Sequence, residues 1–541
     1  MTPAADGSSR AAGSAGQPGR PGWLSPVALI ITGFTLIGLG LRLFLLSRPS
    51  YLLGVTQYDD GPYFGSALRL VHGALPYRDF IIVQPPGITL LMTPAALLAQ
   101  VTSTAWGMAA GRILTVLASS AGIVLVGLLA RHRGPLAVAL SCGVLAIFPG
   151  SLVAAHTVLL EPWLTLFCLI GAVAVLDRDQ LARSGRRLLW GGVAFGFAGA
   201  VEVWAIIPIV VIAVLLAGRE IRRAALFVAG VAIGFCVPVI PFAATAPRRF
   251  YNSFFAAQVF RVVPTRTPVS KRLRLMSGIG QLLHLGTTGT LIAALIIVIF
   301  VAAAFIAAWR ISSRPLTDLD WFAVATCALV VAAFLWYAQF FLHFPAFLAP
   351  FLGLSIGLAA GRLASALRTR DIEAPANQRS PGSWVQCAVV GLAACGIVIL
   401  AVQQGQSYLS VTPRVTPAAL RAVQRIVHPG ACVLSDQASF LIAADRFYSS
   451  QPGCSQMVDA LGTDYSLGHG RDGRSGAARY AAVDATWRSA FHQAQYVWLS
   501  LRFNTRRIAW TPALRSYFRD HFTRVYKDGK RDALYARTTS G

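Results

Sequence analysis

Long apolar runs recur from residue 24 to residue 404, and they constrain the fold more than any other feature of the sequence. A helix needs roughly 20 apolar residues to cross about 30 Å of hydrocarbon. Because 55% of the 541 residues are hydrophobic and only 13% are charged, the chain cannot cover a soluble core with a polar surface. The sequence therefore predicts a polytopic α-helical membrane protein.

The number of spans depends on the stretch QPPGITLLMTPAALLAQ at residues 84–100, which is apolar but short and begins next to two prolines. If this stretch does not cross, about eleven spans remain. They lie near residues 24–47, 108–130, 135–153, 156–176, 190–201, 203–217, 224–242, 288–308, 321–340, 344–361 and 384–404. With a cytoplasmic N-terminus, the arginine-rich connections then all face inward, as the positive-inside rule requires. These connections are residues 131–134, 177–187, 218–223, 309–314 and 361–370. We therefore expect 84–100 to be a re-entrant or surface-lying helix on the outer face.

Two segments flank this transmembrane domain of residues 24–404. Residues 1–23 are rich in Gly, Ala, Ser and Pro, which predicts a disordered cytoplasmic arm without a cleavable signal. Residues 405–541 alternate helix and strand signals, among them a helix start at Thr416 and Pro417 and a strand in YVWLSL. An odd number of spans places this small α/β domain outside the cell membrane, over the outer opening. Acceptor binding and a structural lid are both open as its role.

The cysteines agree with this topology. Six of the eight lie in predicted spans, where they act as small apolar residues. The other two, Cys432 and Cys454, lie in the C-terminal domain. An oxidising outer compartment allows them to form a disulfide, which we expect, with two free thiols as the alternative.

Few carboxylates are predicted at the outer face, and ionisable groups at membrane depth are usually functional. They are Asp59, Asp60 and Asp79 in outer loop 48–107, Glu161, and Glu202. Singly, each has a structural interpretation, such as a helix N-cap for Asp60 or a first-turn acid for Glu161. Together they predict one pocket.

The outer loop at 243–286 is basic and contains no acid. Its cations are Arg248, Arg249, Arg261, Arg266, Lys271, Arg272 and Arg274. The aromatic residues between them suit a helix in the membrane interface, and guanidinium groups bind phosphate oxygens in pairs. The loop is therefore either a lipid-headgroup anchor or a site for a lipid phosphate. A carboxylate pocket facing such a loop could move a sugar from a lipid phosphate to a hydroxyl, because a carboxylate can act as general base and positive charge stabilises the leaving phosphate.

The stretch YDDGPYFGSALRLVHGALPYRDF…QPPG resembles the first outer loop of the GT-C membrane glycosyltransferases, in the branch of protein-O-mannosyltransferases and aminoarabinose transferases. Asp59, Asp60 and Tyr63 occupy the places of that branch's Asp-Glu-x-x-Tyr pattern. Leu160, Glu161 and Pro162 are similar to its second acidic motif. YAQFFLHFPAFLAPFLGL at residues 337–354, with His343, resembles the late outer-edge motif of actinobacterial members. The C-terminal domain, including its two cysteines, also resembles the extracytoplasmic domain of such proteins.

The resemblance implies roles for individual residues. Asp59 would be the catalytic base, Asp60 would orient it or bind a divalent metal ion with it, and Glu161 would be a second pocket acid. We also expect eight residues to bind substrate, those of the basic loop because their charge suits phosphate oxygens: Tyr63, Arg78, Arg248, Arg249, Arg261, Lys271, Arg272 and His343. No cofactor is required. Adjacent carboxylates repel each other, and either a divalent ion at Asp59 and Asp60 or the guanidinium of Arg78 could relieve that repulsion. Asp60 stands where Glu is commoner in the family, and Glu202 stands where a basic residue is common, so donor recognition can differ.

The expected partners are a polyprenyl-phosphate sugar donor, an envelope glycan, glycolipid or protein acceptor, and membrane lipids. The expected location is the cell membrane. We expect no nucleic-acid binding, because the 47 basic residues include only three lysines, an imbalance typical of a GC-rich genome. A transporter or flippase of lipid-linked sugars would place acids near the midplane in repeat-related broken helices. A non-catalytic envelope-assembly scaffold is the other alternative.

Overall fold

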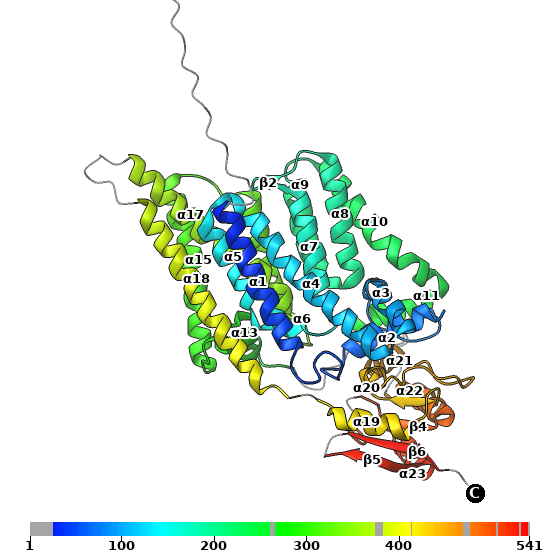
Figure 1. Ribbon diagram of the computed structural model, residues 1–541. Coiled ribbons are helices and arrows are strands. Elements are labelled where there is room, and N and C mark those ends of the chain that lie inside the picture. The colour runs from blue at the N-terminus through cyan, green and yellow to red at the C-terminus, as the bar shows by residue number, and fades with distance from the viewer. Residues whose placement is uncertain are drawn as a thin grey trace, which may run out of the picture.

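The computed structural model describes residues 25–259, 266–373, 382–412, 414–468, 476–504, 507–529 and 532–538. Arg261 and the N-terminal arm lie outside these residues. A bundle of long helices occupies one part of the molecule, and a small sheet with its helices occupies the other (Figure 1).

Each predicted span overlaps one of the bundle helices or, at 135–153, two of them. They are α1 (Pro26–Leu46), α4 (Thr104–Ala130), α5 (Pro135–Ile147), α6 (Pro149–Ala155), α7 (Glu161–Val175), α8 (Gly185–Val201), α9 (Ile206–Ala217), α10 (Ile221–Thr245), α15 (Thr287–Ser312), α16 (Asp318–Trp336), α17 (Pro345–Glu373) and α18 (Gly382–Ser407). Within the described residues, seven helices are long and apolar enough to cross a membrane, or eight if α5 and α6, bent by 54°, form one span. The remaining predicted spans correspond to the shorter helices α7, α8 and α9, so the structure supports a multi-pass protein without establishing a count of eleven.

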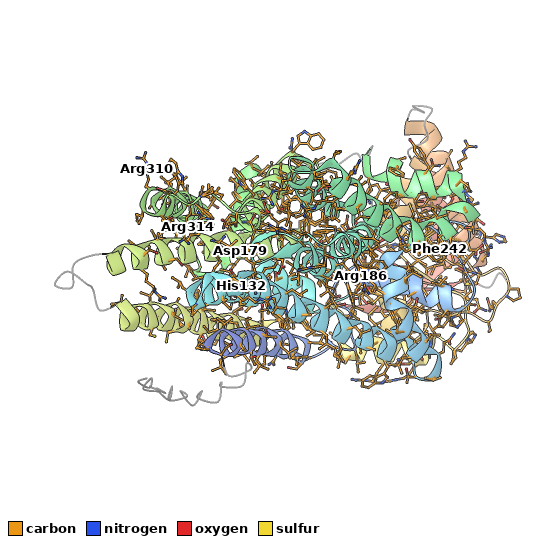
Figure 2. The ribbon with its side chains drawn as sticks, turned by 90° about the horizontal axis from the view of Figure 1, so that it is seen from above. His132, Asp179, Arg186, Phe242, Arg310 and Arg314 are labelled. Carbon is orange, nitrogen blue, oxygen red and sulfur yellow. A yellow bond between two sulfur atoms is a disulfide. The ribbon has the colours of Figure 1, made fainter. Side chains whose placement is uncertain are left out.

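The two ends of the bundle differ. The end at the top of Figure 1, here called the loop end, carries the arginine-rich connections that the sequence places together. Figure 2, seen from above, shows His132, Asp179, Arg186 and Arg314 among the residues there. The opposite end, here called the domain end, carries α2 (Asp60–Val71), α3 (Gly87–Val101) and the C-terminal residues. The stretch 84–100 thus contributes a helix beside α2 at the domain end.

The basic loop 243–286 also lies at the domain end (Figure 1). It forms α11 (Pro247–Phe250), a π-helical turn at Tyr251–Ala256, α12 (Ala257–Val259), α13 (Val269–Ser277) and α14 (Ile279–Leu282). The aromatic rings of Phe250 and Phe254 stack with their centroids 5.2 Å apart. This stacking fixes the π-helical turn against the first outer loop, where Tyr77 meets Phe250 edge to face.

The C-terminal residues form a four-stranded sheet in the order β3-β4-β6-β5. The strands are β3 (Val433–Ser435), β4 (Tyr496–Leu499), β5 (Phe522–Asp528) and β6 (Asp532–Arg537). Only the pair β3 and β4 is parallel. The helices around the sheet are α19 (Pro417–Ile426), α20 (Ala438–Ala443), α21 (Ala460–Gly468), α22 (Gly476–Gln493) and α23 (Pro512–His521). Cys432 and Cys454 are joined by a disulfide at the start of β3.

This sheet domain packs directly on the first outer loop. The Nε2 atom of Gln437 and the hydroxyl of Ser439 both donate to the carbonyl of Gln57, at 3.0 and 3.2 Å. A Cβ atom on Gly61 would lie 2.4 Å from the backbone nitrogen of Ser439, so only glycine allows α2 to approach the domain this closely. The C-terminal domain therefore holds the backbone on both sides of Asp59.

Candidate active site

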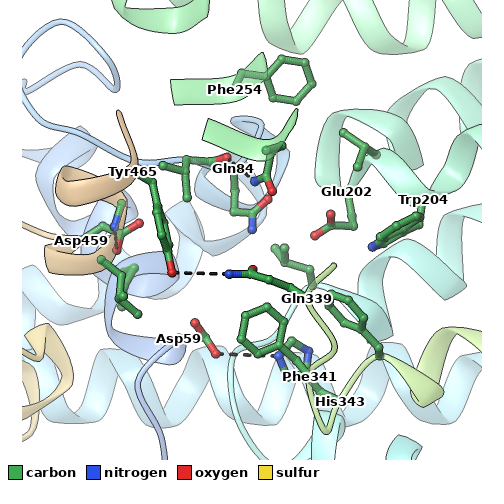
Figure 3. Close-up of a pocket in the computed structure, with 18 of the residues that line it drawn as sticks. Asp59, Gln84, Glu202, Trp204, Phe254, Gln339, Phe341, His343, Asp459 and Tyr465 are labelled. Carbon is green, nitrogen blue, oxygen red and sulfur yellow. Dashed lines mark hydrogen bonds and ion pairs between the residues drawn. The ribbon is translucent and has the colours of Figure 1, made fainter. Parts of the chain in front are cut away.

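A cavity of about 730 Å³ opens at the domain end, between the bundle, the basic loop and the C-terminal domain (Figure 3). This volume is typical of a small-molecule site. Its walls come from seven segments of the chain: residues 58–63, residues 83–84, Leu160, residues 202–204, residues 254–258, residues 336–344 and residues 459–465. Aromatic rings and side-chain amides line most of it, and three carboxylates, Asp59, Glu202 and Asp459, reach it. Such a mixture of rings, amides and acids suits a polyhydroxylated ligand.

Asp59 lies at the base of this cavity, and its side chain is 31% exposed. The loop before α2 places it there, because Asp59 is the residue that precedes the helix. Its Oδ2 atom lies 3.8 Å from the Nε2 atom of His343, in the segment between α16 and α17. The Nδ1 atom of His343 lies 2.5 Å from Oε1 of Glu161, at the start of α7. The imidazole therefore bridges the two predicted catalytic acids, Asp59 and Glu161.

The electrostatics of this bridge set the protonation of His343 and Asp59. Burial alone would lower the pKa of His343, but the charges of Glu161 and Asp59 outweigh it and raise the pKa to about 9. Burial raises the pKa of Asp59, and the positive charges of His343 and Arg507 oppose that rise. At neutral pH His343 is thus a cation and cannot accept a proton, whereas the Asp59 carboxylate can.

Asp60 does not line the cavity. Its side chain is fully buried, and its Oδ2 atom accepts hydrogen bonds from Arg112 at 2.6 Å, Thr157 at 2.7 Å and Thr56 at 3.0 Å. Arg112, on α4, also donates to the carbonyls of Tyr51 and the residue after it. The adjacent carboxylates Asp59 and Asp60 therefore point to different environments, and Asp60 fixes the loop that carries Asp59.

The sequence suggested that Arg78 could relieve the repulsion between Asp59 and Asp60. In the structure Arg78 pairs with a different acid. Arg78 is exposed and forms an ion pair with Asp79 at 2.8 Å. The cation that neutralises Asp60 is Arg112, which the sequence analysis did not single out. A signal was present, because an arginine near the start of an apolar span should have a carboxylate partner.

The predicted substrate-binding cations of the basic loop have different environments. Arg272 is buried and donates to the carbonyls of Phe334, Tyr337 and Ala338, so its guanidinium holds the end of α16 and does not reach the cavity. Arg249 donates to the carbonyl of Arg78 at 2.6 Å. Arg248 and Lys271 are exposed. Tyr63, in contrast, lines the cavity and accepts a hydrogen bond from Gln84 at 3.4 Å.

Asp459 is a cavity residue that sequence reasoning missed. It lies in the C-terminal domain, directly before α21, and its Oδ1 atom accepts hydrogen bonds from the hydroxyl of Tyr58 at 2.8 Å and from the backbone of Gly462 at 2.7 Å. The guanidinium of Arg507 lies 3.7 Å from the centroid of the Tyr58 ring. No local motif of the C-terminal domain marks Asp459, because only the fold brings this residue next to the first outer loop.

The donor set around Asp59 does not form an oxygen cage for a divalent ion. Such ions require several oxygen ligands. Asp60 is already neutralised by Arg112, and a cationic imidazole lies between Asp59 and Glu161. Among the described residues, no group of three His, Cys, Asp or Glu side chains is placed to hold a metal. The predicted metal ligands Asp59 and Asp60 therefore do not converge on one point.

Comparison with known proteins agrees with this architecture. A family model described as Glycosyltransferase family 87 matches residues 83–337, a little under half of the chain. ArnT from Cupriavidus metallidurans in the apo state is similar in structure with a TM-score of 0.57 and 16% identity, over 95% of this chain and 99% of that one. The same ArnT bound to undecaprenyl phosphate has a TM-score of 0.54 and 15% identity, over 94% of this chain and 99% of that one. The oligosaccharyltransferase of Archaeoglobus fulgidus in the apo form has a TM-score of 0.51 and 11% identity, over 96% of this chain and 75% of that one. No curated protein matches.

The chain thus has the fold of the GT-C membrane glycosyltransferases. The resemblance drawn from the first outer loop is confirmed at that level. At identities of 11–16% the match establishes the architecture alone. The chemistry must come from the site.

Proposed function

We propose that this protein is a membrane glycosyltransferase that moves a sugar from a polyprenyl-phosphate carrier to an acceptor hydroxyl at the outer face of the cell membrane. The observation that carries the proposal is the position of Asp59, a carboxylate at the base of a cavity that the bundle and the C-terminal domain share. The ArnT structure contains undecaprenyl phosphate, which supports a carrier of this class. The acceptor is an envelope glycan, a glycolipid or a protein.

The proposed reaction needs one proton transfer. Asp59 takes the proton from the acceptor hydroxyl, whose oxygen forms a bond to the anomeric carbon. The bond from that carbon to the phosphate oxygen breaks, and the phosphate leaves with the electron pair. A phosphate ester is a good leaving group, so no general acid is required. His343, as a cation, keeps Asp59 ionised and supplies positive charge inside the cavity.

The C-terminal domain supplies part of the same cavity through Asp459 and α21. Because it contacts the loop on both sides of Asp59, we assign it to acceptor binding in addition to closing the site. The three cavity carboxylates can each accept hydrogen bonds from sugar hydroxyls.

The proposal is tested by incubating the purified protein in lipid nanodiscs with a panel of polyprenyl-phosphate sugars and measuring released lipid phosphate by mass spectrometry. Asp59→Asn should lower turnover by about 10²- to 10⁴-fold, because asparagine keeps the shape and loses the basicity. Asp79→Asn is the matched control, since Asp79 lies in the same loop and pairs with exposed Arg78. Equal turnover by Asp59→Asn would refute the base assignment. No release from any donor, even with envelope extract, would favour a transporter or a scaffold.

We also propose that the reaction does not depend on a divalent ion, because His343 supplies the charge beside Asp59. Turnover should therefore be unchanged after treatment with EDTA and after addition of Mg²⁺ or Mn²⁺. Loss of turnover with EDTA, restored by one of these ions, would contradict this assignment.

A further inference from the structure

A second, much smaller cavity lies behind Glu161, inside the helix bundle. Its volume is about 10 Å³. That is close to the space that one water molecule needs. The lining residues are Ser119, Leu145, Ser151, Glu161, Pro162, Thr165 and Ala346, which come from five helices. The large cavity and this small one thus lie on opposite sides of the Glu161 and His343 pair.

Three polar atoms that line this small cavity have no partner among the described residues. They are Oε2 of Glu161, the hydroxyl of Ser151 and the hydroxyl of Thr165, and their side chains belong to residues no more than 7% exposed. The buried hydroxyls of Thr115 and Ser120 on α4, in contrast, donate to the carbonyl four residues earlier in their own helix. Leaving a buried polar group unsatisfied costs about 1–3 kcal/mol. Three such atoms around one cavity indicate a shared ligand.

A fourth polar group reaches the same cavity. The hydroxyl of Ser119 accepts a hydrogen bond from Nε of Arg42 at 2.9 Å, which leaves its own proton available to donate. Arg42 is completely buried on α1, and its other donors go to the carbonyls of Gly38, Leu145 and Ala146. The cavity therefore joins Glu161 to a buried guanidinium through a single hydroxyl.

Charge decides between a water molecule and a small cation as the ligand. Glu161 is the one carboxylate among the lining residues and is already paired with the His343 cation, while Ser119, which also lines the cavity, accepts from the guanidinium of Arg42. Two like charges 4 Å apart repel by about 4 kcal/mol at an effective dielectric constant of 20. A further cation beside the paired Glu161 is therefore unfavourable, whereas a neutral molecule that both donates and accepts fits all four groups.

We propose that this cavity is a site for one ordered water molecule, which ties Oε2 of Glu161 to Ser151, Thr165 and Ser119. Glu161 uses its other oxygen to hold His343, and His343 faces Asp59. The water stops the carboxylate from turning, so the imidazole keeps Nε2 directed at the catalytic base. Ser151, Thr165 and Ser119 are in this way positioning residues for Asp59. This last step rests on the proposed function.

The test combines a structure with kinetics. A structure of the full chain in lipid nanodiscs, at a resolution that shows ordered water, should have a peak at about 2.5–3.0 Å from Glu161 Oε2, Ser151 and Thr165. Thr165→Val, which keeps the volume and loses the hydroxyl, should lower kcat about tenfold, as loss of outer-shell partners commonly does, and leave the donor KM unchanged. Thr165→Ser should restore kcat. Ser120→Ala is the matched control, because that hydroxyl is satisfied within its own helix.

Each result decides the proposal. An empty cavity, or Thr165→Val with the kcat of Ser120→Ala, overturns it. A peak with ligand distances below about 2.5 Å, and turnover that requires Na⁺ in place of choline, would assign the cavity to a cation and overturn the water. If no donor gives turnover, the proposed function fails, but the peak still decides whether the water site exists.

Discussion

Buried acids gather at both ends of the bundle, but their partners differ. At the loop end, Oδ2 of Asp320 accepts from Arg362 at 2.6 Å and from Arg133 at 3.1 Å, and Asp318 pairs with Arg219 at 2.6 Å. At the domain end, Asp59 and Glu161 share the single imidazole of His343. Glu202 and Asp459 add two further carboxylates to that cavity. The loop end thus supplies guanidinium groups for its acids, whereas the cavity at the domain end is lined by three carboxylates and one imidazole.

This difference separates structural acids from functional ones. A buried carboxylate with its own guanidinium is electrically balanced and holds two segments together. A carboxylate that shares its cation retains capacity for a substrate proton or hydroxyl. By this criterion Asp60, with Arg112, resembles Asp320 more than it resembles its neighbour Asp59. Adjacent residues in the sequence therefore belong to different classes.

The largest expected effect tests that division through stability. Asp60→Asn and Asp320→Asn each remove the acid from a fully buried ion pair, so each should lower the free energy of unfolding by about 3–5 kcal/mol. Thermal unfolding in detergent should show both as a large fall in Tm. Asp59→Asn, whose side chain is 31% exposed, should change Tm little.

Activity per folded molecule completes the comparison. Asp320→Asn should retain transfer, because Asp320 lies at the loop end and does not line the cavity, which opens at the domain end. Asp60→Asn should lose part of it, since the loop that holds Asp59 loses its anchor. A stable Asp60→Asn variant without any transfer would return Asp60 to a catalytic role.

The next effect concerns the shared cation. The pKa of His343 is raised from 6.5 to about 9, so its charge stabilises the fold fully below about pH 6.5, and this contribution is lost as the pH rises through 9. His343→Gln should be less stable than wild type at pH 6 and approach it near pH 10. Its turnover at neutral pH should fall about tenfold, since Asp59 loses its partner. A stability difference that is constant across this pH range would show that His343 is uncharged.

The sequence predicted the parts of this site that depend on local pattern. Apolar runs located the helices, the Asp-Asp pair before α2 located the first outer loop, and Glu161 followed from an acid at the start of a span. The Thr416 cap formed as expected, with its side chain accepting from Ala419. These features are local because helix length and capping are set by neighbouring residues.

Partner choice could not be predicted in the same way. Whether Asp60 meets Arg78 or Arg112 depends on how α2 packs against α4, and Arg112 is 52 residues away in the sequence. Asp459 reaches the cavity only because the C-terminal domain packs on the first outer loop, some 400 residues earlier, as the separation of 401 between Tyr58 and Asp459 shows. Arg272 was predicted to bind substrate because its loop is basic. In the structure its guanidinium donates instead to carbonyls at the end of α16 that have no helical partner.

The smallest expected effect separates two arginines of the basic loop. Arg248, on α11, is exposed and has no carboxylate partner among the described residues, whereas Arg272 is buried against backbone carbonyls. Arg248→Ala should raise the donor KM about five- to tenfold with kcat unchanged, the cost of one charged hydrogen bond to phosphate. Added salt should reduce the difference in donor KM between Arg248→Ala and wild type, because salt screens exposed charges. Arg272→Ala should instead lower Tm. An unchanged donor KM for Arg248→Ala would make this residue a lipid-headgroup anchor, and the phosphate of the donor would then be held by other cations of the loop.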